Sequence, residues 1–128
     1  MKKICLLLVM LLALAGCGTT TQESTAGYQQ ITAEEAKEMM DTLDDEIILD
    51  VREQDEYDAG HIPGAILLPV GRIDAESAES AIPEKDTTVL VYCRSGNRSK
   101  KASDALAALG YTQVYEFGGI QDWPYETE

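Results

Sequence analysis

The segment Val89-Leu-Val-Tyr-Cys-Arg-Ser-Gly-Asn-Arg-Ser99 decides the fold of this chain. Its first five residues are β-prone and almost entirely apolar, which is typical of a buried central strand. A polar loop follows, in which Gly96 and Asn97 are the residue types that most readily accept a positive φ. Ser99 is then predicted to cap a helix that ends at Gly110. The apolar face of that helix consists of Ala102, Ala105, Leu106 and Leu109.

Cys93 lies where this strand ends, shortly before the predicted helix N-terminus. Backbone N–H groups and the positive end of the helix dipole point towards such a position. There, the pKa of a cysteine can fall from about 8.5 into a range of about 3.5 to 7.5. The segment therefore predicts a reactive thiolate in an anion-binding loop.

The net charge narrows the choice of partners. The chain has 128 residues, 45% of them hydrophobic, and a formal net charge of −13. This length and apolar content suit one domain with its own core. The acidity argues against nucleic acid as a partner, because phosphates would be repelled. Basic residues nevertheless gather, with no acid among them, at Arg94, Arg98, Lys100 and Lys101. We expect a local cationic site for a small anion there.

The chain begins with a predicted export signal. Lys2 and Lys3 precede an apolar run over 4–13, which is short for a membrane span and typical of a signal-peptide core. The next residues, Leu14-Ala-Gly-Cys17, resemble the lipobox of bacterial lipoproteins. This resemblance implies cleavage before Cys17 and a lipid on its thiol. The protein would then be anchored to the extracytoplasmic face of a bacterial membrane. A plain secretory signal or a short anchor is the alternative.

Three regions follow from this reading: a lipoprotein signal peptide over 1–16, a lipidated flexible tether over 17–27, and a folded domain over 28–128. The tether lacks apolar periodicity. Cleavage would change the net charge from −13 to −15, because residues 1–16 contain two lysines and no acid. Of the three cysteines, Cys5 would leave with the signal and Cys17 would carry lipid. Cys93 would be the single free thiol, without a partner for an internal disulfide.

Short apolar segments alternate with polar helical ones through the rest of the chain. The expected strands are 28–31, 47–51, 65–68, 88–92 and 113–116, the last broken by Gly118 and Gly119. The expected helices are 32 to 40 or 43, opened by a capping box from Thr32 to Glu35, then 53–59, 72–81 and 99–109. Such alternation predicts an α/β fold in which helices cover both faces of a parallel sheet. Ligands bind beyond the carboxyl ends of such strands, where Cys93 lies.

Four motifs resemble those of a single-domain rhodanese, in the family's order and at plausible spacing. They are Asp50-Val-Arg52, Gly60-His-Ile-Pro-Gly-Ala65, Cys93-Arg-Ser-Gly-Asn-Arg-Ser99, and Gly118-Gly119 followed by Trp123. The resemblance covers about Gln29 to Tyr125. It implies a rhodanese-like three-layer domain with a five-stranded parallel sheet flanked by helices. It also implies sulfur transfer through a persulfide on the loop cysteine, with neither cofactor nor metal.

In the expected cycle, the Cys93 thiolate takes the outer sulfur of a donor such as thiosulfate, a persulfide or a polysulfide. A thiol, cyanide or a protein then accepts that sulfur. Arg94 and Arg98 would draw in the anionic donor, because a guanidinium fork suits the oxygens of thiosulfate. Ser95 and Ser99 could donate hydroxyl hydrogen bonds. Loop N–H groups would cradle the persulfide, and the predicted substrate-binding residues are Arg94, Ser95, Gly96, Asn97, Arg98 and Ser99.

Other polar residues are assigned supporting roles. Asp50 and Arg52 end a buried strand, and we expect an ion pair there that holds loops near the site. His61, the only histidine, is interpreted as structural. A metal site has little support, because one histidine and one free cysteine cannot complete a usual ligand set. Trp123 and Tyr125 are interpreted as packing residues, and we expect a monomer.

Two rival functions use the same cysteine. A phosphatase or arsenate reductase also places a cysteine in an anion-binding loop before a helix. The tyrosine-phosphatase pattern has five residues between the cysteine and an arginine, whereas only four separate Cys93 from Arg98. The shorter loop suits sulfur better than a tetrahedral phosphate. The other rival is a tethered sulfur carrier or partner-binding module with little turnover on small acceptors.

Overall fold

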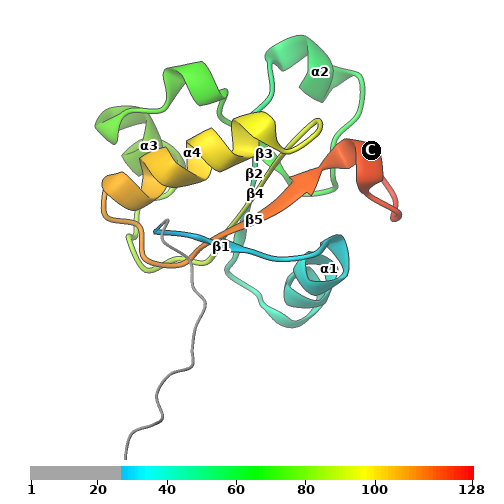
Figure 1. Cartoon of the computed structure of the whole chain (residues 1–128), viewed down its shortest axis with the longest axis horizontal. Helices are drawn as coiled ribbons and strands as arrows, with labels where there is room; N and C mark the ends of the chain where they lie inside the picture. Colours follow the sequence, from blue (N-terminus) through cyan, green and yellow to red (C-terminus); the bar gives the residue numbers. More distant parts are fainter. Residues whose placement is uncertain (1–26) are drawn as a thin grey trace, which may run out of the picture.

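The computed structural model describes residues 27–128. The predicted signal peptide, Cys17 and almost all of the predicted tether lie outside these residues, so those expectations stay predictions. None of the helices in the described part has the length and apolar character needed to cross a membrane. The described residues form a central sheet with α1 on one side and α3 and α4 on the other (Figure 1).

The elements follow the predicted alternation. The strands are β1 (Gln29–Gln30), β2 (Ile47–Asp50), β3 (Ile66–Leu67), β4 (Val89–Cys93) and β5 (Val114–Gly119). The helices are α1 (Ala33–Thr42), α2 (Gln54–Asp58), α3 (Ala75–Ala81) and α4 (Asn97–Ala108), with 3-10 turns η3 (Val70–Arg72) and η4 (Ile120–Asp122). The sheet has five strands in the order β1-β5-β4-β2-β3, and every neighbouring pair is parallel. The predicted five-stranded parallel α/β fold is confirmed.

Strand β4 is the centre of the sheet, and all five of its residues are buried. Because successive side chains of a strand point to opposite faces, its residues divide between two cores. Val89, Val91 and Cys93 pack with residues of α3 and α4. Leu90 and Tyr92 pack on the other face with residues of α1. Cys93 therefore lies on the α4 side of the sheet.

Side-chain caps fix where two helices begin. Thr32 accepts a hydrogen bond from the Glu35 N–H and the Glu35 carboxylate accepts one from the Thr32 N–H, so the predicted capping box is confirmed. The helix expected over 72–81 instead begins at Ala75. Asp74 forms the capping box there with Ser77, and the preceding residues form the tighter turn η3.

Two predictions about the segments beside Cys93 were wrong. Helix α4 begins at Asn97, and its N-cap is Gly96 with φ of +113°, so Ser99 is not the cap. A glycine adopts this backbone conformation without steric cost, which allows the helix to begin earlier than the side-chain cap suggested. Strand β5 was expected to break at the glycine pair but continues to Gly119, which pairs with Cys93 after a shift in register between Val91 and Cys93.

Candidate functional site

Cys93 lies at the carboxyl end of β4, under the loop that leads into α4. Its side chain is buried, 1% exposed, and it is the free cysteine of the described residues. The backbone N–H of Gly96 donates to its Sγ at 3.0 Å. This contact depends on the positive φ of Gly96, which turns the chain back over the sulfur as the helix begins. The loop therefore surrounds the sulfur with hydrogen-bond donors of the main chain.

Two opposing effects set the pKa of Cys93. Burial of the thiol is the larger single effect and raises the pKa. Hydrogen bonds from the Ser99 hydroxyl and from the backbone N–H groups of Ser99, Gly96 and Ser95 lower it, and together they leave the pKa below its ordinary value. The pKa of Cys93 is therefore shifted in the direction that the sequence predicted, because the hydrogen-bond donors favour the charged form of the sulfur.

Ser99 lies in the first turn of α4 and faces the interior with no exposed surface. Its Oγ is 3.5 Å from the Sγ of Cys93 and 3.0 Å from the carbonyl oxygen of Gly96. The same hydroxyl makes a short hydrogen bond with the carboxylate of Glu116. Ser99 thus connects the reactive sulfur to a buried acid, a contact that a capping serine would not make.

Glu116 is a member of the site that sequence reasoning missed. It lies in β5, next to β4, and is 2% exposed. Its carboxylate also accepts hydrogen bonds from the Gly118 N–H at 2.9 Å and from the Gln30 amide at 3.2 Å. An acid at an inward position of an apolar strand was the available signal, because buried acids are rare unless they have partners.

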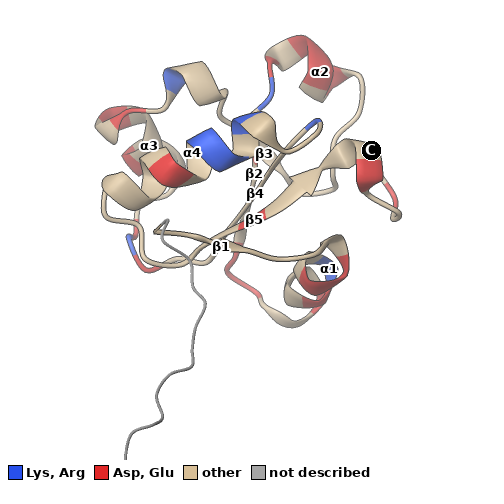
Figure 2. Cartoon of the chain, in the orientation of Figure 1, with Lys and Arg blue, Asp and Glu red and all other residues tan. Residues whose placement is uncertain are grey.

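Arg98 is held by an acid. Its guanidinium forms a bidentate ion pair with Glu56 of α2, with N–O distances of 2.8 and 2.9 Å. Basic residues at the start of α4 and acidic residues on α2 can be followed in Figure 2. Arg94 is exposed, and its carbonyl accepts the N–H of Gln121 at 3.1 Å. Donor binding by either arginine stays a prediction, and in this structure Arg94 is the more exposed of the two.

The Arg98–Glu56 pair predicts a pH-dependent contribution to stability. The hydrogen bond from Arg98 is the largest cause that lowers the pKa of Glu56 from 4.5 to about 2. Because the folded-state pKa is depressed, the stabilisation is present above pH 4.5 and is lost as the pH falls towards 2. Glu56→Gln should cost about 1 kcal/mol at neutral pH, and this cost should shrink in acid. Urea unfolding at several pH values measures this loss of stability, and Glu79→Gln, at an exposed position, is the control. If Glu56→Gln costs the same at every pH, the ion pair does not account for the loss.

Asp50 and Arg52 form the expected ion pair at the carboxyl end of β2. The Arg52 Nη2 lies 2.7 Å from the Asp50 carboxylate and also donates to the Gly60 carbonyl at 2.8 Å. The Tyr92 hydroxyl donates to Asp50 at 2.7 Å and accepts the Ile62 N–H at 3.1 Å. This network joins β2, β4 and the segment around Gly60. Its member in β4, Tyr92, directly precedes Cys93.

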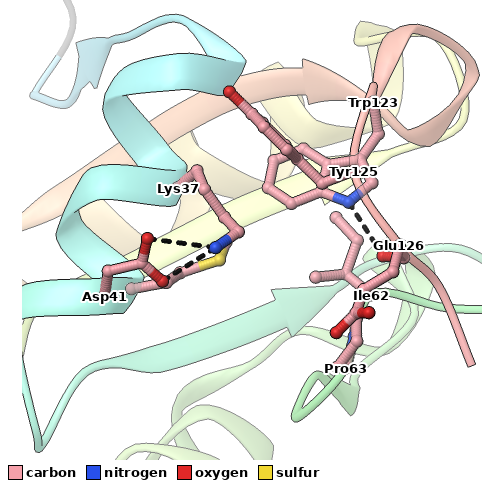
Figure 3. Close-up of a pocket in the computed structure, with 8 residues that line it drawn as sticks. Lys37, Asp41, Ile62, Pro63, Trp123, Tyr125 and Glu126 are labelled. Atoms are coloured by element: carbon pink, nitrogen blue, oxygen red, sulfur yellow. Dashed lines mark hydrogen bonds and ion pairs between the residues drawn. The ribbon is translucent and has the colours of Figure 1, made fainter.

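His61, Trp123 and Tyr125 contribute to packing beside the C-terminus. The His61 ring stacks on Tyr57 at 3.8 Å between centroids. Trp123 packs against Tyr125 with its ring edge-on at 4.9 Å. These two aromatics help line a pocket of about 180 Å³ with Lys37, Met40, Asp41, Ile62, Pro63 and Glu126 (Figure 3). No residue of the 93–99 loop lines this pocket, and no group of three or more metal-ligating side chains occurs within 27–128.

Gly119 allows β5 to approach the loop after Cys93. A Cβ at this position would overlap the Arg94 carbonyl oxygen and lie 2.6 Å from the Ser95 nitrogen. Gly119→Ala should therefore displace the loop, cost about 1–3 kcal/mol and slow alkylation of Cys93. Gly71→Ala is a matched control, because no atom lies within 4 Å of an added Cβ there. Unfolding and alkylation rates equal to those of the control would show that the loop accommodates the methyl group.

The fold and site define a class: an α/β protein with a hydrogen-bonded cysteine in the loop between a central strand and a helix N-terminus. The model of the rhodanese-like domain matches residues 32–125, and the chain belongs to this family. It is 39% identical over 74 residues to the thiosulfate sulfurtransferase PspE of Escherichia coli, covering 58% of this chain and 70% of that protein. It is 37% identical over 97 residues to the thiosulfate sulfurtransferase GlpE of Coxiella burnetii, and this match covers 75% of this chain and 87% of that protein. The chain is thus a member of the rhodanese-type sulfurtransferases.

Two further similarities are informative. The chain is 32% identical over 112 residues to the putative sulfur carrier protein YrkF of Bacillus subtilis, covering 87% of this chain and only 59% of that protein. A solved rhodanese with anions from E. coli has a TM-score of 0.61 at 36% identity, covering 65% of this chain and 96% of that one. The rhodanese-like domain thus makes up nearly all of one relative and part of another.

Proposed function

We propose that this protein moves a sulfane sulfur from thiosulfate, a persulfide or a polysulfide to a thiophilic acceptor through a persulfide on Cys93. The proposal is based on the hydrogen-bond donors that surround the sulfur of Cys93. Its Sγ accepts the Gly96 N–H at 3.0 Å, and hydrogen bonds lower its pKa despite burial. A cysteine that ionises readily in a loop of main-chain donors is suited to attack sulfur and to hold an anionic product.

The chemistry consists of two displacements. The Cys93 thiolate attacks the outer sulfur of thiosulfate, a new S–S bond forms, and the S–S bond of thiosulfate breaks as sulfite leaves with the electron pair. In the second step an acceptor such as cyanide or a thiolate attacks the outer persulfide sulfur. Cys93 leaves as the thiolate, which restores the starting state. The first product is an anionic persulfide, which loop N–H groups stabilise.

Arg94 is the residue we expect to attract the anionic donor. It is exposed, whereas the Arg98 guanidinium is engaged by Glu56. Ser95 and Asn97 are also exposed on the loop and can present polar groups to an incoming anion, while Gly96 and Ser99 are buried and contact the sulfur directly. In this assignment Arg98 joins the loop to α2 and adds positive charge near Cys93.

A second candidate is supported by the similarity to a putative sulfur carrier protein. In that case the Cys93 persulfide passes to a protein partner, and turnover on small acceptors is slow. The same loop and persulfide serve both functions. Rapid transfer to a partner protein combined with slow transfer to cyanide would favour the carrier.

The proposed function is tested with the full chain carrying Cys5→Ser and Cys17→Ser, purified in mild detergent so that Cys93 is the only thiol. Incubation with thiosulfate should add the mass of one sulfur to Cys93, and cyanide should remove it as thiocyanate. Hydrolysis of a phosphoester is measured in parallel, and we expect none. If Cys93 takes up no sulfur from thiosulfate or from a polysulfide, the proposed function is wrong.

A further inference from the structure

The Ser99 hydroxyl lies between two buried acidic groups. Its Oγ is 3.5 Å from the Cys93 Sγ and hydrogen-bonded to the Glu116 carboxylate. All three residues are buried: the exposed fraction is 1% for Cys93, 2% for Glu116 and 0% for Ser99. A serine hydroxyl has one proton to donate, so Ser99 can donate to the sulfur or to the carboxylate but not to both.

This limit links the protonation states of Cys93 and Glu116. When Glu116 is ionised, Ser99 donates to it, and the thiol of Cys93 can donate to the Ser99 oxygen. When Cys93 is a thiolate, Ser99 stabilises it only by turning its proton towards the sulfur. Glu116 then loses its hydrogen bond from Ser99 unless it carries a proton of its own, which it can donate to the Ser99 oxygen.

Electrostatics favour the second arrangement whenever the thiolate forms. Two anions separated by one hydroxyl in a buried site repel each other strongly, because the local dielectric is low. The hydrogen-bond partners of Glu116 in the described part of the chain are neutral: Ser99, the Gly118 N–H and the Gln30 amide. A neutral Glu116 removes this repulsion.

The other ionisable groups facing this pair do not neutralise Glu116. From the β1 side, the pKa of Tyr28 is raised by burial and then by the charges of Asp104 and Glu116. From α4, Arg98 interacts with the charge of Cys93, but its guanidinium is paired with Glu56. The positive charge near the site thus acts on the sulfur side of the bridge.

We propose that Cys93 and Glu116 share one proton through Ser99, with Glu116 carrying it when Cys93 becomes the thiolate while the pair still holds one proton. The Cys93 proton passes to the Ser99 oxygen as the Ser99 proton passes to Glu116. The electron pair of the S–H bond stays on the sulfur, so a thiol and a carboxylate become a thiolate and a carboxylic acid. The buried charge remains one throughout. Glu116 is accordingly a positioning residue that acts on Cys93 through Ser99.

The test measures ionisation of Cys93 in the full chain carrying Cys5→Ser and Cys17→Ser, compared with the same chain carrying Glu116→Gln. The rate of alkylation by iodoacetamide and the ultraviolet absorbance of the thiolate are followed against pH. With Glu116 present, the thiolate should appear in two steps separated by a plateau, as coupled groups titrate. In the Glu116→Gln variant, a single step should remain, at lower pH than the second step of the parent chain. At the plateau of the parent chain, where the thiolate is only partly formed, alkylation should be about fivefold faster in this variant.

The control is Asp104→Asn, which removes an exposed acid from α4, the helix that contains Ser99, and leaves the contacts of Ser99 with Cys93 and Glu116 unchanged. It should keep the two-step titration. Infrared spectroscopy of the parent chain follows the proton directly: a protonated carboxyl band should persist through the first thiolate step and disappear with the second. This measurement needs no variant, so it decides the question even if Glu116→Gln fails to fold.

A single-step titration with the same midpoint in all three proteins, or a thiolate that forms without the carboxyl band, would overturn the shared proton. The inference rests on the proposed use of Cys93 as a nucleophile, but these measurements involve no sulfur donor. Sulfur uptake without coupled titration would refute only the role of Glu116. Coupled titration without sulfur uptake would refute only the proposed function.

Discussion

Cys93→Ser is expected to abolish sulfur uptake and to reduce transfer from thiosulfate to cyanide to the uncatalysed rate. Serine replaces the sulfur with an oxygen of similar shape, but a hydroxyl does not ionise near neutral pH and forms no persulfide. Mass spectrometry should show no added sulfur, and the thiocyanate assay should show only background. The effect is large because every step of the proposed cycle forms or breaks a bond at this one sulfur.

The prediction requires that the substituted protein remains folded. Cys93 packs in the core with α3 and α4, and serine is small enough to occupy the same space. Thermal unfolding of the variant checks this condition. Ser103→Ala is a matched control on α4, because Ser103 is buried and its hydroxyl has no hydrogen-bond partner in the described residues. It should keep full activity. Residual turnover in the Cys93→Ser protein, above that of a protein-free sample, would place the chemistry elsewhere.

The loop around Cys93 could be predicted from the sequence because its features are local. A buried strand, a turn with glycine and a helix follow one another within 89–109, so their order alone places the cysteine before a helix N-terminus. The pair Asp50 and Arg52 could be predicted for the same reason, since only two positions separate them. The residue at which α4 begins could not be predicted from the sequence. Serine and glycine are both common N-cap residues, and only the backbone conformation of Gly96 shows that it, and not Ser99, is the cap.

The contacts that sequence reasoning missed join residues far apart in the chain. Glu56 and Arg98 are 42 positions apart, and Ser99 and Glu116 are 17 apart. These contacts exist only after α2 approaches α4 and β5 pairs with β4. The continuation of β5 through its glycine pair has a similar origin, since Gly119 is needed where the Arg94 backbone comes too close for a side chain. Strand pairing thus determines how the acids and arginines are distributed around the sulfur.

Asp50→Ala is expected to destabilise the fold by about 3–5 kcal/mol, which is a large part of the 5–15 kcal/mol of a typical domain. Asp50 is fully buried and Arg52 is 5% exposed. Removing the carboxylate leaves the guanidinium buried with only the Gly60 carbonyl as a hydrogen-bond partner among residues 27–128, and the Tyr92 hydroxyl loses its acceptor. An unpaired buried charge costs far more than the ion pair itself contributes.

Urea unfolding measures this cost, and the chain offers a matched comparison. Lys37 and Asp41 form an ion pair of 2.8 Å on the exposed surface of α1, close to the 2.7 Å of Arg52 and Asp50. Asp41→Ala should destabilise the fold far less than Asp50→Ala, because exposed pairs are solvated and screened. If Asp50→Ala costs no more than Asp41→Ala, the buried network does not stabilise the fold. Because Tyr92 directly precedes Cys93 in β4, the Asp50 substitution should also slow alkylation of the thiol, whereas the Asp41 substitution should not.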